Sequence, residues 1–243
     1  PESSVDYGWD DGSGADYVTV NTIGDGPGWA GGIFPRNELD NSFFGDVTIG
    51  EFTLDDELHA TGRVVFDEMA GYNAGIHIGF MDAGDVLQDR LDDPTVNETP
   101  DFMGFIVLEQ ERHLAQYRLD ENAVADLGLS QRGTSKGPQT MPDQTPMDFE
   151  IFYDPNDPGG FGEGKLTVTL TNPETGESGT NELFMPFGAR DSETKFNAFG
   201  ILQGGPAETP DINGRAEGFI DDIQYTSNGE CGVQALCDML PDV

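Results

Sequence analysis

Four charged or ionisable side chains lie in strand-like segments, at positions that face away from the apolar residues of the same segment. His77 alternates with apolar residues in AGIHIGFM, so it belongs to the less apolar side of that strand. Arg63, Asp148 and Glu150 are placed in the same way in their own segments. If these strands share one sheet, the four side chains line a polar groove suited to a glycan. Each of them singly also fits a solvated sheet face.

Asp148 and Glu150 form a pair of carboxylates on one strand. Residues two apart share a face, which places the carboxyl groups within the roughly 5–9 Å that glycoside hydrolysis uses. Chance pairs are expected in a chain with 46 Asp and Glu, so a hydrolase is kept only as a minor alternative.

Two adjacent aspartates interrupt the apolar strand pattern FIDDIQY. By strict alternation Asp221 shares a side with Phe219, Ile223 and Tyr225, toward the core or its margin. A buried carboxylate must be hydrogen-bonded, paired or metal-bound, and Ca²⁺ takes such oxygen ligands. Asp221 and Asp222 are therefore candidate calcium ligands. The alternative is a structural aspartate that accepts backbone N–H bonds.

Trp9 and Trp29 lie in a Gly-rich segment near the start of the chain. Aromatic faces stack on sugar rings, and Trp favours recognition surfaces, so both are candidate glycan-binding residues. The alternative is that they close one end of the fold.

Cys231 and Cys237 are the two cysteines of the chain and lie close together near its end. This spacing favours a disulfide that closes a small loop in an oxidising compartment. We expect a single domain over residues 1–230, and a disulfide-closed tail or the start of a linker over 231–243. We also expect a secreted or cell-surface location, with any signal peptide already removed.

The charge balance of the 243 residues excludes several partners. Eleven Lys and Arg against 46 Asp and Glu give a formal net charge of −35, which disfavours nucleic acid and anionic membranes. Hydrophobic residues reach 36% with 16 Phe, enough for a core. So acidic a chain suits high-salt water, where ions screen self-repulsion, and hence a marine or halophilic extracellular setting. An ordinary acidic soluble protein is the alternative.

Short strand patterns recur along the chain, separated by polar or Gly- and Pro-containing joints. With no helix expected between them, they predict an antiparallel β-sandwich or barrel. The segment DPNDPGGFGEG is the loop of a long hairpin, because its Pro and Gly do not suit a central strand. The predicted strands are 47–54, 58–66, 74–81, 102–110, 113–120, 147–154, 165–171, 196–203 and 218–226.

Two parts of this pattern carry a resemblance. The run MDFEIFYDPNDPGGFGEGKLTVTL resembles the central hairpin of concanavalin A-like jelly rolls, which include laminin G-like and many polysaccharide-active domains. FNAFGILQ followed by GFIDDIQYTS resembles their last two strands. The resemblance implies an all-β, antiparallel jelly-roll β-sandwich.

A second resemblance is to jelly-roll alginate lyases. Their Arg-x-Glu-Leu, Gln-Ile-His and late Tyr-containing strands are similar in order to PRNEL, GIH and FNAFG here, which makes Arg36 and His77 the implied catalytic residues. Such a lyase neutralises a uronate carboxylate with Arg and Gln, and moves protons with His and Tyr. Here Gly75 stands in place of the Gln, and Leu202 stands roughly in place of the Tyr.

Because these catalytic positions are vacant, the sequence favours a non-catalytic carbohydrate-binding or adhesion module of a larger secreted protein, stabilised by calcium. One alternative is a polysaccharide lyase that cleaves a uronate glycan by β-elimination. Another is a structural subunit of a surface layer or filament, which would self-associate. A polysaccharide or cell-surface glycan is the expected partner of the first two.

Overall fold

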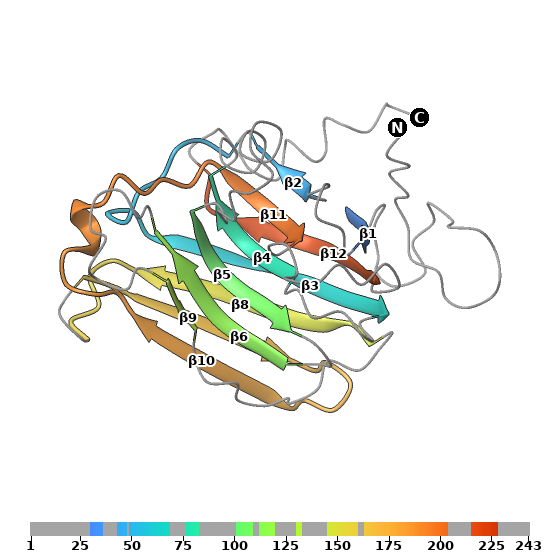
Figure 1. Ribbon diagram of the computed structural model, residues 1–243. Coiled ribbons are helices and arrows are strands. Elements are labelled where there is room, and N and C mark those ends of the chain that lie inside the picture. Colours follow the sequence, from blue (N-terminus) through green and yellow to red (C-terminus); the bar gives the residue numbers. More distant parts are fainter. Residues whose placement is uncertain are drawn as a thin grey trace.

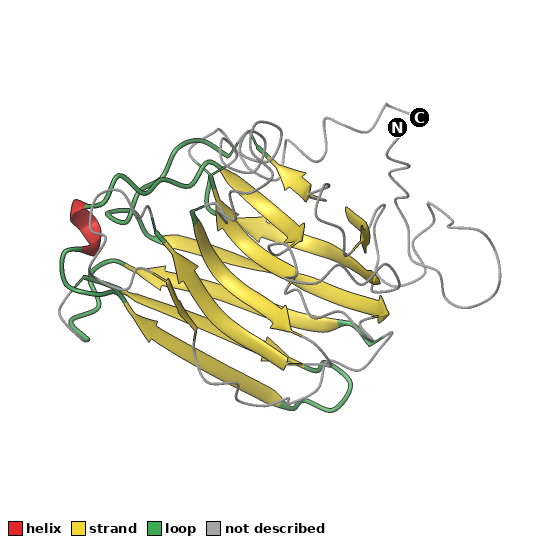
Figure 2. Cartoon of the chain, viewed as in Figure 1, coloured by secondary structure: helices red, strands yellow, loops and turns green. Residues whose placement is uncertain are grey.

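The structure is a computed structural model that describes residues 30–35, 43–47, 49–68, 76–82, 101–108, 112–119, 130–132, 145–159, 163–203 and 215–227. Within these ranges the chain forms twelve strands and one short 3₁₀ helix, η1 (Ala189–Asp191). Figure 2 shows that strands dominate the described part. The all-β prediction is confirmed.

The strands form two antiparallel sheets that face each other as a jelly-roll β-sandwich (Figure 1). Sheet A has the order β1-β12-β3-β8-β9-β10. Its strands are β1 (Ala30–Pro35), β12 (Arg215–Tyr225), β3 (Leu58–Glu68), β8 (Met147–Asp154), β9 (Lys165–Thr171) and β10 (Ser178–Phe184).

Sheet B has the order β2-β11-β4-β5-β6-β7. It pairs strands that are far apart in the sequence, since β11 lies between β2 and β4. Its strands are β2 (Phe43–Asp46), β11 (Ala198–Gln203), β4 (Ile76–Met81), β5 (Phe102–Leu108), β6 (Arg112–Arg118) and β7 (Ser130–Arg132).

The core lies between the facing sheets and is filled by aromatic and branched side chains. Alternation along each strand sends every second residue inward. Phe105 of sheet B packs on Phe149 of sheet A, with ring centroids 5.6 Å apart. Burial of this apolar area stabilises the pairing of the two layers.

The strand predictions hold best where alternation is strict. The predicted strands 147–154 and 165–171 match β8 and β9, and the hairpin between them forms. In β8 every second residue points inward and is buried, and the residues between them are more exposed.

The predicted strand 47–54 is wrong. Among the described residues of this span only Phe52 pairs, in an isolated bridge to Phe196. Ile49, Phe52 and Leu54 are buried in the core. The alternating apolar residues of this segment therefore pack in the core although the segment forms no ladder of strand hydrogen bonds. The Thr53 backbone N–H donates to Asp56 Oδ2 at 2.8 Å, which turns the chain immediately afterwards.

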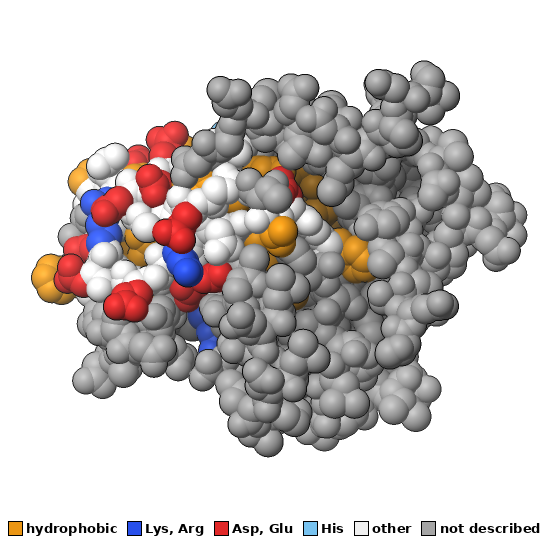
Figure 3. Space-filling view, turned by 90° about the horizontal axis from the view of Figure 1, so that it is seen from above, with side chains coloured by type: hydrophobic (Ala, Val, Ile, Leu, Met, Phe, Trp, Pro, Cys, Tyr) orange, Lys and Arg blue, Asp and Glu red, His pale blue; other side chains and the backbone are white. Residues whose placement is uncertain are grey.

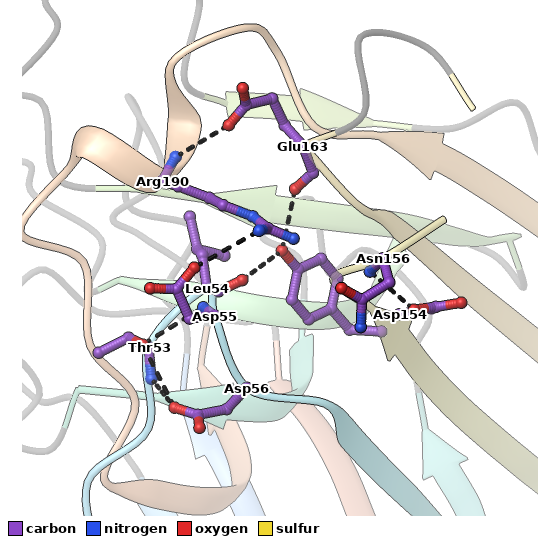
Figure 4. Close-up of polar contacts among 9 residues, drawn as sticks. Thr53, Leu54, Asp55, Asp56, Asp154, Asn156, Glu163 and Arg190 are labelled. Atoms are coloured by element: carbon purple, nitrogen blue, oxygen red, sulfur yellow. Dashed lines mark hydrogen bonds and ion pairs between the residues drawn. The ribbon is translucent and has the colours of Figure 1, made fainter. Parts of the chain in front are cut away.

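Polar contacts link Tyr153 with the backbone of Leu54 and Glu163, close to Asp55 and Arg190, which are labelled in Figure 4. The Tyr153 hydroxyl donates to the Leu54 carbonyl at 2.8 Å, and burial raises the pKa of the phenol. Arg190, from η1, places Nη1 3.5 Å from Asp55 Oδ1. Figure 3 shows carboxylates interspersed with a few Lys and Arg side chains over the described surface at one end of the molecule.

In the described part of the chain, no helix has both the length and the apolar character needed to cross a membrane.

Candidate active site

His77 lies on the outer face of sheet B, away from the core. Its neighbours Ile76 and Ile78 belong to the core cluster, so alternation directs His77 to the opposite side. It is in register with Leu202 of β11 on one side and Ile106 of β5 on the other. The predicted orientation of His77 relative to its apolar neighbours is therefore confirmed.

The described side chains named here around His77 are apolar, and the residue is enclosed. Only 4% of the residue is exposed, and its ring meets Phe102 edge to face at 4.8 Å between centroids. Phe102 forms a buried cluster with Met81, Ala198 and Leu202. Electrostatic interactions at a site with so little solvent are stronger than in water.

Four glycines cross sheet B beside His77, and we call them the glycine row: Gly45, Gly200, Gly79 and Gly104, in register on β2, β11, β4 and β5. On the outer face the row separates the line of side chains that contains His77 from the line that contains Phe102 and Met81. Those two lines are four residues apart along β4, or about 14 Å at the rise of an extended strand. The row carries no side chains of its own, and the rings of His77 and Phe102 lean over it from the two lines until their centroids are 4.8 Å apart.

The glycines are also required by the packing of the strands. A Cβ on Gly104 would lie 2.2 Å from the Ile78 carbonyl oxygen, and a Cβ on Gly79 would lie 2.3 Å from that of Met103. Both contacts are to backbone, which cannot move aside as a flexible side chain could. Larger residues are thus excluded from the centre of the row.

Gln116 of β6 is in register with Gly104, directly beyond the end of the glycine row. It is 5% exposed, and its Oε1 atom is buried with no hydrogen-bond partner among the described residues. Buried polar groups are ordinarily hydrogen-bonded. Arg118 follows two residues later on the same face of β6, in register with Phe102.

Sequence reasoning missed both the glycine row and Gln116. The signal for the row was present, because IHIGFM, FMGFIVL and AFGILQ each carry one glycine inside an apolar strand. The alignment of those glycines depends on the order of strands in the sheet, which no single segment reveals.

The other predicted groove residues lie on the opposite side of the molecule. Arg63 Nε donates to Asp148 Oδ1 at 2.8 Å on the outer face of sheet A, and this hydrogen bond raises the pKa of Arg63. On the same face, His59 Nε2 lies 2.9 Å from Glu150 Oε1. The three strands that carry these residues do not share one sheet, so the expected single groove joining His77 to Arg63, Asp148 and Glu150 is corrected.

The predicted orientation of Asp221 toward the core is also wrong. The register of β12 against β3 shifts between Asp221 and Gln224, and Asp222 has a φ of 52°. This bulge turns Ile223 and Tyr225 to the core but leaves Asp221 opposite Arg63 on the outer face. Burial raises the pKa of Asp221, whose Oδ2 has no partner among the described residues.

The surroundings of the two aspartates do not favour calcium. Arg63 Nη1 lies 3.7 Å from Asp222 Oδ2, so a guanidinium already supplies positive charge there. The described residues contain no group of three or more His, Cys, Asp or Glu side chains arranged to hold a metal ion. Calcium stabilisation of the chain stays a prediction.

Three tyrosines lie among the described residues, and none faces His77. Tyr117 and Tyr153 are in the core, and Tyr225 packs against it. Burial raises the pKa of Tyr117 to about 12. Leu202 stands directly across from His77, at the place where the sequence left a tyrosine position vacant.

Several predicted residues fall outside the described ranges: Arg36, Trp9, Trp29, Cys231 and Cys237. Their roles in catalysis, glycan binding and a disulfide stay predictions, as does the division into residues 1–230 and 231–243.

No protein-family model and no curated protein matches the chain. Among solved structures it is similar to an alginate lyase from Chlorella virus, at 11% identity, over 86% of this chain and 88% of that one, with a TM-score of 0.48. It is also similar to alginate lyases from Pseudomonas aeruginosa (10% identity, 72% and 66% covered, TM-score 0.42) and Klebsiella pneumoniae (13%, 71% and 60%, 0.44). The chain spans less than two thirds of the length of these last two enzymes.

The solved structures named above are enzymes, not binding modules. The expectation that this chain is a non-catalytic carbohydrate-binding or adhesion module is corrected on that finding.

Proposed function

We propose that the protein is a polysaccharide lyase that cleaves a uronate glycan by β-elimination, with His77 as the catalytic base. The observation that carries the proposal is the position of His77, an enclosed imidazole beside a strip of sheet that has no side chains. The ring of Phe102 leans over the glycine row onto His77, so a sugar ring that displaced Phe102 from the row would bring its C–H bonds next to the imidazole.

The reaction needs one base and one acid. The neutral imidazole takes the proton at C5 of the uronate, the electrons of that bond form the C4=C5 double bond, and the C4–O4 bond breaks. The leaving oxygen must then be protonated. When H5 and O4 lie on the same side of the ring, the imidazolium of His77 can return its proton to O4, so that one residue serves both steps.

The apolar neighbours of His77 support this chemistry. Phe102, Leu202 and Ile106 exclude water from the imidazole, which strengthens hydrogen bonds to the reacting groups. A sugar also presents apolar C–H faces, which pack favourably on such side chains.

The charge of the chain sets conditions on the substrate. A net charge of −35 repels a polyanionic glycan at low ionic strength. We therefore propose that the enzyme works in a saline extracellular setting, where the Debye length is short, or with a divalent cation such as Ca²⁺ bridging the glycan and surface carboxylates.

The test is the ultraviolet absorbance of the unsaturated product, followed with alginate, pectate and ulvan in about 1 M salt with Ca²⁺. The wild type should generate product from at least one uronate polymer. His77→Ala should lower the rate by about 10²–10⁴-fold, as expected for loss of a general base.

The matched control is His59→Ala, because His59 is a described histidine on the outer face of sheet A. It should keep the wild-type rate, and circular dichroism should show that both variants fold. A wild-type trace that stays flat on all three polymers, or a His77→Ala rate equal to the wild type, overturns the proposal.

A further inference from the structure

The outer face of sheet A is hollowed, on the opposite side of the molecule from His77. The strands β8, β9 and β10 run side by side there (Figure 1). The hollow has a volume of about 160 Å³, and its lining comes from β8, from β9 and from Asp157 in the hairpin loop between them. We call it the sheet A hollow. Pockets for drug-sized ligands have roughly 300–1,000 Å³, so this one suits a single small ring.

The register of the three strands explains why the surface is hollowed there. Thr167 of β9 lies between Phe152 of β8 and Glu182 of β10. Thr169, two residues later on the same face, lies beside Glu150. The threonine side chains are short and these neighbours are long, so a trough follows the outer face of β9.

The Lys165 ammonium closes one end of the trough. Its Nζ lies 2.8 Å from Asp157 Oδ2 and 3.4 Å from Glu182 Oε1. The Gly159 backbone N–H donates to Asp157 Oδ1 at 2.7 Å, which fixes the carboxylate in the hairpin loop. The hydrogen bond from Lys165 lowers the pKa of Asp157, so the pair is charged at neutral pH. An ammonium has three N–H donors, and two carboxylate partners leave one donor for a ligand.

The sheet A hollow offers hydrogen-bond acceptors and donors beside an apolar surface. Glu150 and Asp154 present carboxylate oxygens, which accept hydrogen bonds. The hydroxyls of Thr167 and Thr169 both donate and accept. The half-buried ring of Phe152 supplies the apolar surface. A sugar has the complementary groups, because its hydroxyls donate and accept and its C–H face packs on an aromatic ring.

The charges of the hollow determine which class of sugar it fits. Three carboxylates and one ammonium belong to the lining. A uronate would bring a further carboxylate next to these three, which like-charge repulsion disfavours. An amino sugar would have to compete with Lys165, which already occupies the carboxylate of Asp157. A neutral sugar meets neither obstacle, since its hydroxyls can donate to carboxylates and accept from the ammonium.

We propose that the sheet A hollow binds a neutral sugar unit and is a second carbohydrate site of this protein, separate from the site at His77. The proposal goes beyond the lyase function and does not depend on it, because it uses the other sheet and a sugar without charge. A protein with both sites would hold a neutral glycan on sheet A while sheet B acts on a uronate chain.

The test is ligand-observed NMR of the full chain with hexasaccharides of three charge classes. The neutral probes are the hexamers of glucose, mannose and xylose, and the charged probes are a uronate hexamer and a glucosamine hexamer. At least one neutral hexamer should bind saturably, with a Kd of about 1 mM as expected when a single ring makes the contacts.

Two variants place the binding in the hollow. Thr167→Tyr fills the trough with a side chain that suits a strand, and it should raise the Kd of the neutral hexamer at least tenfold. Thr171→Tyr is the matched control, on the same face of β9 but outside the lining, and should keep the wild-type Kd. Glu150→Gln keeps the shape of an exposed side chain, so it tests the site even if Thr167→Tyr does not fold. It should raise the Kd about fivefold, because hydrogen bonds to charged groups are the stronger ones.

The remaining results would overturn the proposal. They are no saturable binding of a neutral hexamer up to about 10 mM, or neutral binding that Thr167→Tyr leaves unchanged or that Thr171→Tyr weakens equally. A charged hexamer whose binding alone is lost in Thr167→Tyr would refute the charge argument. The lyase assay keeps the two proposals apart. Thr167→Tyr should cleave uronate polymers at the wild-type rate, and a neutral hexamer that Thr167→Tyr no longer binds supports the hollow even if the wild type cleaves no polymer.

Discussion

His113 makes the stability of the sandwich sensitive to mild acid. It faces the core from β6, it is fully buried, and neither ring nitrogen has a partner among the described residues. Burial disfavours the charged imidazolium, and this lowers the pKa of His113 from 6.5 to about 4. The unfolded chain therefore binds a proton at a pH where the folded chain does not.

The sign and size of the effect follow from linkage. Between pH 6.5 and pH 4 the unfolded state holds more protons than the folded state, so stability falls as the pH falls through this window. At a pH of about 4.5 the loss of unfolding free energy from this one residue is about 2–3 kcal/mol relative to neutral pH, since each unit of pKa difference is worth about 1.4 kcal/mol. Above about pH 7 His113 no longer makes the unfolding free energy depend on pH.

Urea unfolding of the wild type and His113→Leu across this pH range is the assay. The difference in unfolding free energy between the two should grow by about 2–3 kcal/mol from neutral pH to about pH 4.5, in favour of the leucine variant. Carboxylate titrations are common to both proteins and cancel in the difference. His59→Gln, at a half-exposed histidine, should follow the wild type. A constant difference between wild type and His113→Leu across the range would refute the reasoning.

Two further predictions concern the glycine row and the charge of the chain. Gly104→Ala should lower the free energy of urea unfolding by about 3 kcal/mol, because its Cβ would meet the Ile78 carbonyl and the Gly79 Cα. Gly176→Ala, which has open space around it, is the control and should cost about 1 kcal/mol. Equal losses in the two variants would contradict the close approach of β4 and β5. Raising the sodium chloride concentration from about 0.05 M to about 1 M should raise Tm by several degrees in thermal scans, because salt screens the repulsion within a chain of net charge −35. An unchanged Tm would show that the charges are already well separated.

Local patterns predict the elements of this fold better than its assembly. The inward series of β8 and β9 alternates without interruption, so their bounds follow from hydrophobicity alone. The strand β10 was not predicted, because Gly179 and Asn181 occupy two of its inward positions. At Asp221 the error came from assuming unbroken alternation across a bulge, which only the pairing with β3 reveals.

The candidate site was predictable only in part, for a related reason. His77 was identified because its own segment shows which side of the strand it occupies. That Arg63 and Asp148 belong to the other sheet depends on strand order, a property of the whole chain. Gln116 gave no local signal, since a glutamine between apolar residues is ordinary in a half-exposed strand.

The strand order of sheet B also determines when the site can form during folding. Local hairpins join β4, β5 and β6, and others join β8, β9 and β10, so these meanders can form early. The strand β11 inserts between β2 and β4, which are about 155 and 120 residues earlier in the chain, and β12 inserts between β1 and β3. The wall of the site that Leu202 and Gly200 supply to His77 is therefore completed by late, long-range pairing. A ribosome-bound chain that ends before β11 would hold His77 in a meander whose edge is still unpaired, exposed to aggregation and without the surface on which a sugar could lie.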